Sequence, residues 1–273
     1  MTTDSIPVFL SPQALVGQTG EYPVRIFDVS AAETYQDSHI PGAIAVDPQS
    51  YLRNSPPVIG LLPAPGNIAA LLSRLGITPE TRVIAYDDQG GRVAARLLWT
   101  LQVAGHKKFA LLDGGFNSWR QHDLPVTADI MHATPSAAHY PVQLQHHLIA
   151  DKEYILRHLK DPSVTIVDVR NPDEFYGIEK RAARNGHIPG AINLPWQQVL
   201  DGQQQLLPKI QLLRLLQEKH ILPEHELIVH CHSHQRSAHT CLVLHALGYQ
   251  RVRGYPGSWS DWASYSDTPV VCD

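Results

Sequence analysis

A repeated block of sequence constrains the fold of this chain more than any other feature. Residues 27–30 and 39–44 spell Phe-Asp-Val-Ser and His-Ile-Pro-Gly-Ala-Ile, and residues 167–170 and 187–192 repeat them as Val-Asp-Val-Arg and His-Ile-Pro-Gly-Ala-Ile. A block that returns in the same order indicates two copies of one structural unit. The chain has 273 residues, which is enough for two domains of about 100–200 residues, each with its own core.

Within each half, short apolar stretches alternate with segments of helical periodicity. In the second half the predicted strands are at residues 164–169, 191–194, 226–230 and 251–255, and the predicted helical segments are at residues 151–159, 208–219, 237–247 and 259–263. Apolar strands separated by crossover helices indicate a mainly parallel sheet with helices on both faces. The sequence therefore predicts an α/β fold with two tandem domains at residues 1–130 and 149–273, joined by a linker at residues 131–148.

Composition excludes several classes of function. The formal net charge is −4 and charged residues make up 18% of the chain, so we expect no nucleic-acid partner. No apolar run approaches the roughly 18 residues that a membrane span needs, and residues 1–10 do not resemble a secretory signal. Three cysteines form no disulfide framework. These observations predict a cytoplasmic protein with no membrane partner.

One loop in the second half predicts reactive chemistry. An apolar strand ends at Cys231, and a helical segment begins near Ser237. In parallel α/β sheets, sites lie at the carboxyl ends of the strands, and the backbone N–H groups at the start of a helix favour an anion. Such surroundings lower a thiol pKa from about 8.5 to somewhere near 3.5–7.5. We therefore predict that Cys231 is the nucleophile of an enzyme.

Four features in order resemble the two-domain form of the rhodanese (sulfurtransferase) family, and the resemblance spans nearly the whole chain. They are the twin His-Ile-Pro-Gly-Ala motifs, the Asp-Val-Arg…Glu-Phe segment at residues 168–175, the loop at residues 231–236, and the Gly-Ser-Trp…Trp segment at residues 257–262. The loop is similar to that of the bacterial thiosulfate sulfurtransferase subgroup. The resemblance implies two rhodanese-like domains that need no cofactor.

The resemblance also implies a reaction and a set of site residues. Cys231 would take the outer sulfur of thiosulfate as a persulfide and pass it to cyanide or another thiophilic acceptor, such as a thiol. Thioredoxin and a sulfur-relay protein are possible protein acceptors. The residues implied in substrate binding are Arg184, Trp196, His232, Ser233, His234, Gln235, Arg236 and Ser237. Arg236 and Arg184 are the candidates for the donor anion, and the N–H groups of residues 232–237 would hold the persulfide.

The first half lacks the nucleophile, since Asp87 stands where the second half has Cys231. A carboxylate cannot form a persulfide, so we expect one site per chain. Asp168, Arg170 and Glu174 have the chemistry of an ion pair that braces the end of the sheet, and we expect that structural role.

Several alternatives remain open on the sequence. His232, His234 and His239 lie near Cys231 in sequence, but their spacing does not match a closed zinc site. We therefore expect that no metal binds here. We expect instead that these histidines are solvated and add positive potential near the site. A 3-mercaptopyruvate sulfurtransferase would share the fold and the cysteine. A phosphatase is disfavoured because four residues, not five, separate Cys231 from Arg236. A non-catalytic sulfur-binding module is the third alternative.

Overall fold

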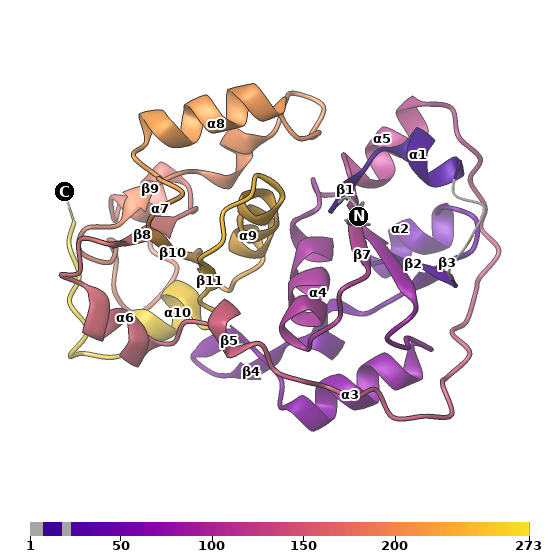
Figure 1. The fold of residues 1–273 in the computed structure, drawn as a ribbon, viewed down its shortest axis with the longest axis horizontal. Coiled ribbons are helices and arrows are strands. Elements are labelled where there is room, and N and C mark those ends of the chain that lie inside the picture. The colour runs from indigo at the N-terminus through magenta and orange to yellow at the C-terminus, as the bar shows by residue number, and fades with distance from the viewer. Residues whose placement is uncertain (1–7, 18–22, 273) are drawn as a thin grey trace, which may run out of the picture. The chain divides into compact units, whose positions relative to one another are not determined.

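The chain forms two compact units, described here by a computed structural model that covers residues 8–17 and 23–272. The first unit contains the described residues up to Tyr51, together with Pro63–Leu144 and Gly202–Leu206. The second unit contains Leu52–Leu62, Gln145–Asp201 and the described residues from Leu207 onward. Each unit therefore includes a short segment from the other half of the sequence (Figure 1).

The described part of the first unit is built on a five-stranded parallel sheet. Across the sheet the strands are β1 (Phe9–Leu10), β7 (Phe109–Leu112), β6 (Arg82–Tyr86), β2 (Val24–Asp28) and β3 (Ala43–Ala45). Its helices are α1 (Pro12–Val16), α2 (Ala32–Asp37), η1 (Pro48–Tyr51), α3 (Pro65–Arg74), α4 (Arg92–Val103) and α5 (Gly115–Gln121). In Figure 1, α4 lies on one side of this sheet, and α2 and α5 lie on the other.

The second unit repeats this plan with a four-stranded parallel sheet in its described residues. Across the sheet the strands are β11 (Val252–Gly254), β10 (Glu226–His230), β8 (Val164–Asp168) and β9 (Ile192–Asn193). Its helices are η2 (His146–Leu148), α6 (Lys152–His158), α7 (Pro172–Phe175), η3 (Trp196–Val199), α8 (Lys209–Glu218), α9 (Arg236–Ala246) and α10 (Ser258–Trp262). The predicted strands and helices of this half are confirmed, and the predicted α/β class with parallel sheets is correct.

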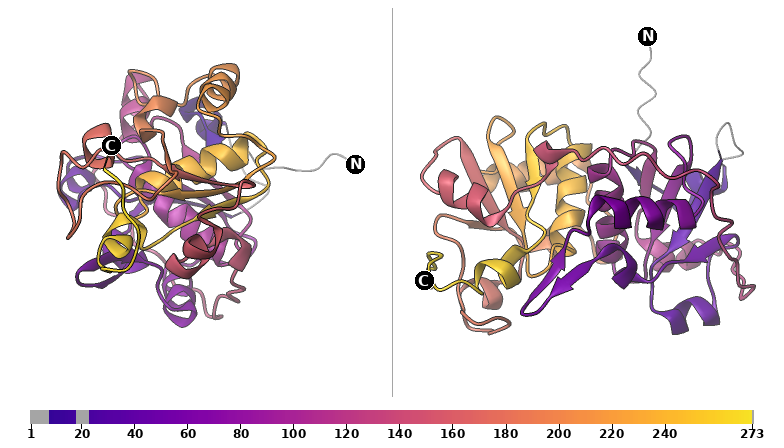
Figure 2. Two further views of the ribbon diagram at one scale, coloured as in Figure 1. Left: turned by 90° about the vertical axis from the view of Figure 1, so that its left-hand side faces the viewer. Right: turned by 90° about the horizontal axis from the view of Figure 1, so that it is seen from below.

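Burial explains why the sequence of the central strand is so apolar. In β10, Leu227, Ile228 and Val229 are fully buried, because helices cover both faces of the sheet. Figure 2 shows these helical layers in two further views. The core of the second unit continues through Ile166 in β8 to Trp259 and Trp262 in α10. Parallel pairing in register places His230 opposite Asp168 at the carboxyl ends of the two strands.

A hairpin from the first half of the sequence belongs to the second unit. It consists of β4 (Arg53–Ser55) and β5 (Val58–Leu61), which pair antiparallel, and β5 packs against α10. In return, Gly202–Leu206 joins the first unit, where the Leu206 N–H donates to Asp113 at 2.8 Å. The domains expected from the sequence, residues 1–130 and 149–273, place Leu52–Leu62 in the first domain and Gly202–Leu206 in the second. Those domain boundaries stay a prediction.

The predicted linker packs onto the first unit. The Tyr140 N–H donates to Ser73 Oγ at 2.9 Å, and the Tyr140 hydroxyl lies 2.9 Å from His106 Nδ1. Residues 131–144 therefore count with the first unit, and η2 begins the second.

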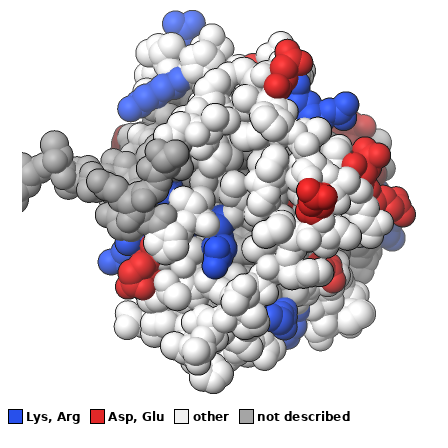
Figure 3. Space-filling model, turned by 90° about the vertical axis from the view of Figure 1, so that its right-hand side faces the viewer, with Lys and Arg blue, Asp and Glu red and all other residues white. Residues whose placement is uncertain are grey.

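Within the described residues, every helix is too short or too polar to cross a bilayer. The face of the molecule in Figure 3 carries scattered charges of both signs.

Candidate active site

Cys231 lies between the end of β10 and the start of α9, at the carboxyl end of the sheet where the sequence predicts it. Its side chain is 1% exposed. A buried neutral thiol is ordinary, whereas a thiolate in the same place needs donors that replace water. The contacts around its sulfur therefore decide what Cys231 can do.

Donors converge on the sulfur of Cys231. The Ser237 hydroxyl lies 3.4 Å from Sγ and donates to it, and His234 Nδ1 lies 2.7 Å from the same hydroxyl oxygen. When that hydroxyl donates to sulfur, its oxygen accepts from the Nδ1–H tautomer of His234. Burial alone would raise the pKa of Cys231, but the Arg236 charge and hydrogen bonds from Ser237 and the Ser233 N–H lower it below its usual value. The surroundings favour a thiolate.

The segment at residues 257–262 hydrogen-bonds to the backbone of Cys231. The Cys231 N–H donates to Ser258 Oγ at 3.3 Å, and the Trp259 N–H donates to the Cys231 carbonyl at 3.0 Å. Ser258 itself adopts a left-handed backbone with φ 51°. The contact between Cys231 and Ser258 joins residues 27 positions apart, and the sequence analysis did not identify it. The Gly-Ser-Trp motif was the available signal, but its contact with Cys231 is a tertiary one.

Arg236 forms a bidentate ion pair with Glu174 of α7. Its two terminal nitrogens lie 2.5 Å and 3.0 Å from the carboxylate oxygens, and Glu174 is 1% exposed. Burial alone would raise the pKa of Glu174, but Arg236 and the Asn171 N–H lower it. The sequence suggested that Glu174 braces the sheet, and the structure shows that its partner is Arg236. This pair holds a positive charge close to Cys231.

The other loop residues have different environments. His234 is fully buried, with a left-handed backbone at φ 59°, while His232 is half-buried. His239, one turn into α9, is buried, and burial lowers its pKa to about 4. The expectation of solvated, charged histidines is therefore wrong for His234 and His239, because both pack inside the domain. Gln235 occupies the N-cap position of α9, but its side chain makes no capping hydrogen bond there.

Arg184 and Trp196 lie against structural elements of the second unit. The Arg184 guanidinium donates to the carbonyl oxygens of Trp262 at 3.0 Å and Thr268 at 2.7 Å. The Trp196 ring packs edge-on against His239 with centroids 5.5 Å apart. These contacts support the fold around the loop, and a role for either residue in binding a donor stays a prediction.

Asp168 and Arg170 form the predicted ion pair at the end of β8. Arg170 donates to Asp168 at 2.6 Å and to the Gly186 carbonyl at 2.7 Å, and its guanidinium lies 4.4 Å from the centre of the Trp259 ring. His230, which the sequence analysis did not single out, has Nε2 3.6 Å from Asp168. Burial lowers the pKa of His230. Asp168, Arg170 and His230 thus form a buried polar network at the carboxyl ends of β8 and β10, and His230 directly precedes Cys231.

The corresponding loop of the first unit holds a carboxylate instead. Asp87 is fully buried, and its Oδ1 accepts from the N–H groups of Gln89 at 2.8 Å and Gly91 at 2.7 Å. Its Oδ2 accepts from the N–H groups of Val93 at 2.7 Å and Ala94 at 3.0 Å. The loop therefore binds an anion that the protein itself supplies.

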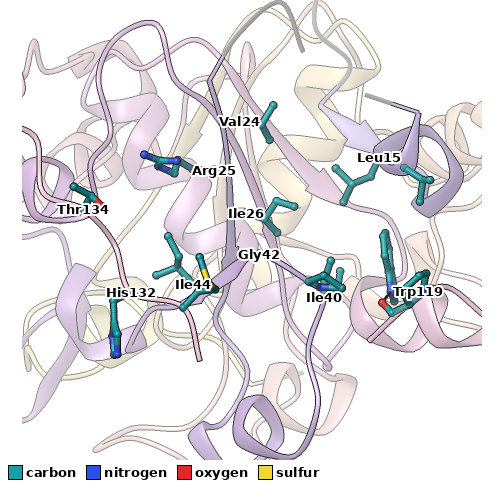
Figure 4. A pocket seen from close by; sticks show the side chains of 14 residues that line it. Leu15, Val24, Arg25, Ile26, Ile40, Gly42, Ile44, Trp119, His132 and Thr134 are labelled. Carbon is teal, nitrogen blue, oxygen red and sulfur yellow. Dashed lines mark hydrogen bonds between the residues drawn. The ribbon is translucent and has the colours of Figure 1, made fainter. Parts of the chain in front are cut away.

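A pocket of about 530 Å³ in the first unit lies elsewhere (Figure 4). Its walls are mostly apolar and include Leu15, Ile26, Ile44 and Trp119, with Arg25 contributing a charge. Among the described residues that line it, none is a cysteine and none carries a carboxylate. Within the described residues, no cluster of three or more His, Cys, Asp or Glu side chains is arranged to hold a metal ion. The reactive chemistry of the described chain is concentrated at Cys231.

Comparison with known proteins agrees with this geometry. Residues 11–122 and 151–265 each match the family of rhodanese-like domains. The thiosulfate sulfurtransferase of Pseudomonas aeruginosa is 37% identical over 265 residues, which cover 97% of each chain. The 3-mercaptopyruvate sulfurtransferase of Mus musculus is 30% identical, covering 92% of this chain and 88% of the relative.

Solved structures share the fold. The crystal structure of YnjE superposes with a TM-score of 0.88 at 24% identity, over 99% of this chain and 70% of that one. Two family matches in one chain account for the repeated sequence, the two parallel sheets and the paired loops. The chain belongs to the rhodanese-like family and carries two copies of its domain.

Proposed function

We propose that this protein is a thiosulfate sulfurtransferase that carries sulfur as a persulfide on Cys231. The observation that carries the proposal is the convergence of the Ser237 hydroxyl, the Ser233 N–H and the Arg236 charge on one buried sulfur. A thiolate is the form of cysteine that attacks sulfur. The name of the 37% identical relative supports thiosulfate as the donor.

The reaction balances in two displacements. The Cys231 thiolate attacks the outer sulfur of thiosulfate, a new S–S bond forms, and sulfite leaves with the electron pair of the broken S–S bond. Cyanide or a thiolate then attacks the terminal sulfur, and Cys231 leaves as a thiolate. One negative charge remains on the enzyme sulfur throughout, so the same donors serve every stage.

In this proposal the backbone N–H groups and the arginines of the site have different roles. Backbone N–H groups of residues 232–237 stabilise the terminal sulfur of the persulfide. Arg236 raises the local positive potential while Glu174 holds it in place, and Arg236 and Arg184 remain the proposed contacts for the donor sulfonate. Before a donor binds, Arg236 pairs with Glu174 and Arg184 donates to the Thr268 carbonyl. These contacts favour a role for both arginines in supporting the structure of the site at that stage.

The decisive experiment compares donors and follows the mass of the protein. Thiosulfate should add one sulfur atom to Cys231, and cyanide should remove it with release of thiocyanate. Steady-state kcat/KM should be higher for thiosulfate than for 3-mercaptopyruvate. A higher kcat/KM for 3-mercaptopyruvate would instead favour a 3-mercaptopyruvate sulfurtransferase, the alternative that the 30% identical relative supports.

Two other functions make different predictions. Hydrolysis of a phenyl phosphate that disappears in Cys231→Ser would point to a phosphatase. Absence of any sulfur adduct after thiosulfate exposure would point to a non-catalytic module.

The thiol chemistry supports a proposal about the cellular setting. Cys231, Cys241 and Cys272 are all described and all unpaired, and a reducing cytoplasm keeps such thiols available. We therefore propose a cytoplasmic enzyme whose acceptor is a small thiol, cyanide, thioredoxin or a sulfur-relay protein.

A further inference from the structure

Gly60 of β5 lies directly against the nucleophile loop. A Cβ atom built on Gly60 would lie 2.3 Å from the Ser233 carbonyl oxygen and 2.9 Å from the Ser233 carbonyl carbon. Both are backbone atoms, so no side-chain rotation could relieve the overlap. Gly60 is buried, although the rest of the hairpin from Arg53 to Pro57 is exposed. A hydrogen bond from its N–H to Asn54 Oδ1, at 2.9 Å, holds it within the hairpin.

A second contact ties the same hairpin to the loop through Ser260. The Ile59 N–H donates to Ser260 Oγ at 3.1 Å, and that hydroxyl also lies 3.1 Å from the Ile59 carbonyl oxygen. The Ser260 N–H in turn donates to the His232 carbonyl at 3.0 Å. The hairpin therefore reaches two consecutive residues of the loop, His232 through Ser260 and Ser233 directly.

These contacts fix the direction of one important N–H group. In a trans peptide the C=O and the N–H point to opposite sides. Because Ser260 holds the His232 carbonyl on one side, the N–H of the same peptide, which belongs to Ser233, is directed to the other side. That N–H is one of the groups that lower the pKa of Cys231.

We propose that Gly60 is a positioning residue for Cys231: its bare backbone seats the β4–β5 hairpin against Ser233 and so aims the Ser233 N–H at the nucleophilic sulfur. The half of the sequence that has no nucleophile thus supplies part of the cradle for the other half. This inference deepens the proposed function and rests on it for its catalytic consequence, but its effect on the thiolate can be measured without any sulfur donor.

The test is Gly60→Ala, with Gly190→Ala as its matched control. Both glycines have left-handed backbones, with φ 76° and φ 78°, but a Cβ on Gly190 would meet no atom within 4 Å. The two substitutions therefore carry the same backbone strain, and only the first displaces Ser233. Each is made in a Cys272→Ser background, so that this exposed thiol does not react.

The measurement is the rate of Cys231 alkylation by iodoacetamide across roughly pH 5 to 10. Gly60→Ala should raise the apparent pKa of Cys231 by about one unit, because a hydrogen bond to the thiolate is lost. It should lower kcat for thiocyanate formation about tenfold and leave KM for thiosulfate within about twofold. Gly190→Ala should match the parent in all three quantities.

A second pair of variants covers the case in which Gly60→Ala does not fold. Ser260→Ala removes the hydroxyl that binds Ile59, whereas Ser264→Ala removes a hydroxyl of the same region that binds only the Asp261 carbonyl. Ser260→Ala should shift the alkylation profile in the same direction by a smaller amount, and Ser264→Ala should not shift it.

Two results would overturn the proposal: a folded Gly60→Ala with the parent alkylation profile, or equal shifts in Gly60→Ala and Gly190→Ala. Unchanged profiles in Ser260→Ala would do the same if Gly60→Ala is unfolded. A parent protein that shows the expected profiles but makes no thiocyanate would contradict the proposed function and leave the positioning role intact.

Discussion

The loops that follow β6 and β10 are built alike and hold different anions. In the first unit, backbone N–H groups from Gln89 to Ala94 surround the carboxylate of Asp87. In the second unit, Ser233 and Ser237 surround the sulfur of Cys231. A strand that runs into a helix creates an anion cradle in both places. The fold thus supplies the cradle twice, and the residue at its centre decides whether the cradle is structural or reactive.

The surroundings of the two loops differ in a second way. Arg92 and Arg236 stand at the same distance in sequence from Asp87 and Cys231, but Arg92 pairs with the side chain of Gln89, whereas Arg236 is clamped by the buried Glu174. Thr34 occupies the position of Glu174 in the first repeat and bonds to Asp88 instead. The arginine at this position is therefore held by a carboxylate in the second unit and contacts an amide side chain in the first.

The largest expected effect comes from changing the central residue of the reactive loop. Cys231→Ser should lower thiocyanate formation by about 10⁴-fold or more, because no thiolate remains. Cys231→Asp should be equally inactive. It should be at least as stable to heat as Cys231→Ser, because its carboxylate can accept hydrogen bonds from the N–H groups of this loop, as Asp87 does in the first unit. Cys272→Ser is the control and should retain full activity. A Cys231→Asp protein less stable than Cys231→Ser would show that the two cradles are not equivalent.

The next effect is expected at the centre of the other loop. Asp87→Asn replaces one acceptor oxygen by an amide that faces two N–H donors, and should lower the free energy of unfolding by about 3 kcal/mol. The kcat of the folded protein should stay within about twofold of the parent, since Asp87 takes no part in the chemistry. Urea unfolding measures the first quantity.

The control for Asp87→Asn is Asp47→Asn, which removes an exposed carboxylate that accepts from the Gln49 N–H at 2.9 Å. It should change the free energy of unfolding by less than about 0.5 kcal/mol. Equal effects of the two substitutions would mean that the first cradle does not depend on its carboxylate.

A smaller effect should follow from Glu174→Gln, which leaves Arg236 with one acceptor in place of a bidentate carboxylate. We expect a loss of about 2 kcal/mol at neutral pH. The pKa of Glu174 is lowered in the folded protein, so its contribution is present above its unfolded pKa of about 4.5 and is lost as pH falls through the folded value. Glu174→Gln should therefore lose less stability than the parent below about pH 4.5.

Urea midpoints across this pH range test the assignment. Glu179→Gln, at an exposed pair with Arg181, is the control and should cost under about 0.5 kcal/mol. If Glu174→Gln loses as much stability at acid pH as the parent does, the ion pair between Glu174 and Arg236 is not a stabilising difference between the two loops.

The smallest of these effects concerns Ser237, whose position in the first repeat is taken by Val93. Ser237→Ala removes the hydroxyl that lies 3.4 Å from the Cys231 sulfur. It should raise the apparent pKa of Cys231 by about half to one unit, equivalent to at most about 1.4 kcal/mol. The pH profile of alkylation measures the shift, and an unchanged profile would assign the thiolate to the backbone and Arg236 alone.

Parts of this molecule could be predicted because their causes are local. The apolar run before Cys231 predicts a buried strand, and the periodicity after Ser237 predicts α9; both are confirmed within a residue or two. The place of Cys231 at the end of that strand follows from them. The acidic residue at Asp87 predicts a loop without a nucleophile, and the structure adds that its carboxylate is bound by the loop itself.

Other contacts could not be predicted because they join residues far apart in the chain. Glu174 meets Arg236 across 62 positions, and Ile59 meets Ser260 across 201. No local periodicity encodes either contact. The burial of His234 and His239 was missed for the same reason, since a polar residue near a loop is usually solvated unless tertiary packing covers it.

The sequence alone therefore determined the repeat, the parallel strands and the identity of the one cysteine at a strand end, because each depends on neighbours a few residues away. Only the tertiary structure decided what surrounds that cysteine: a clamped arginine, a serine hydroxyl, and a hairpin from the other repeat pressed against Ser233. The physical reason is that a thiolate is stabilised by the summed directions of several donors, and those directions exist only after distant segments have packed together.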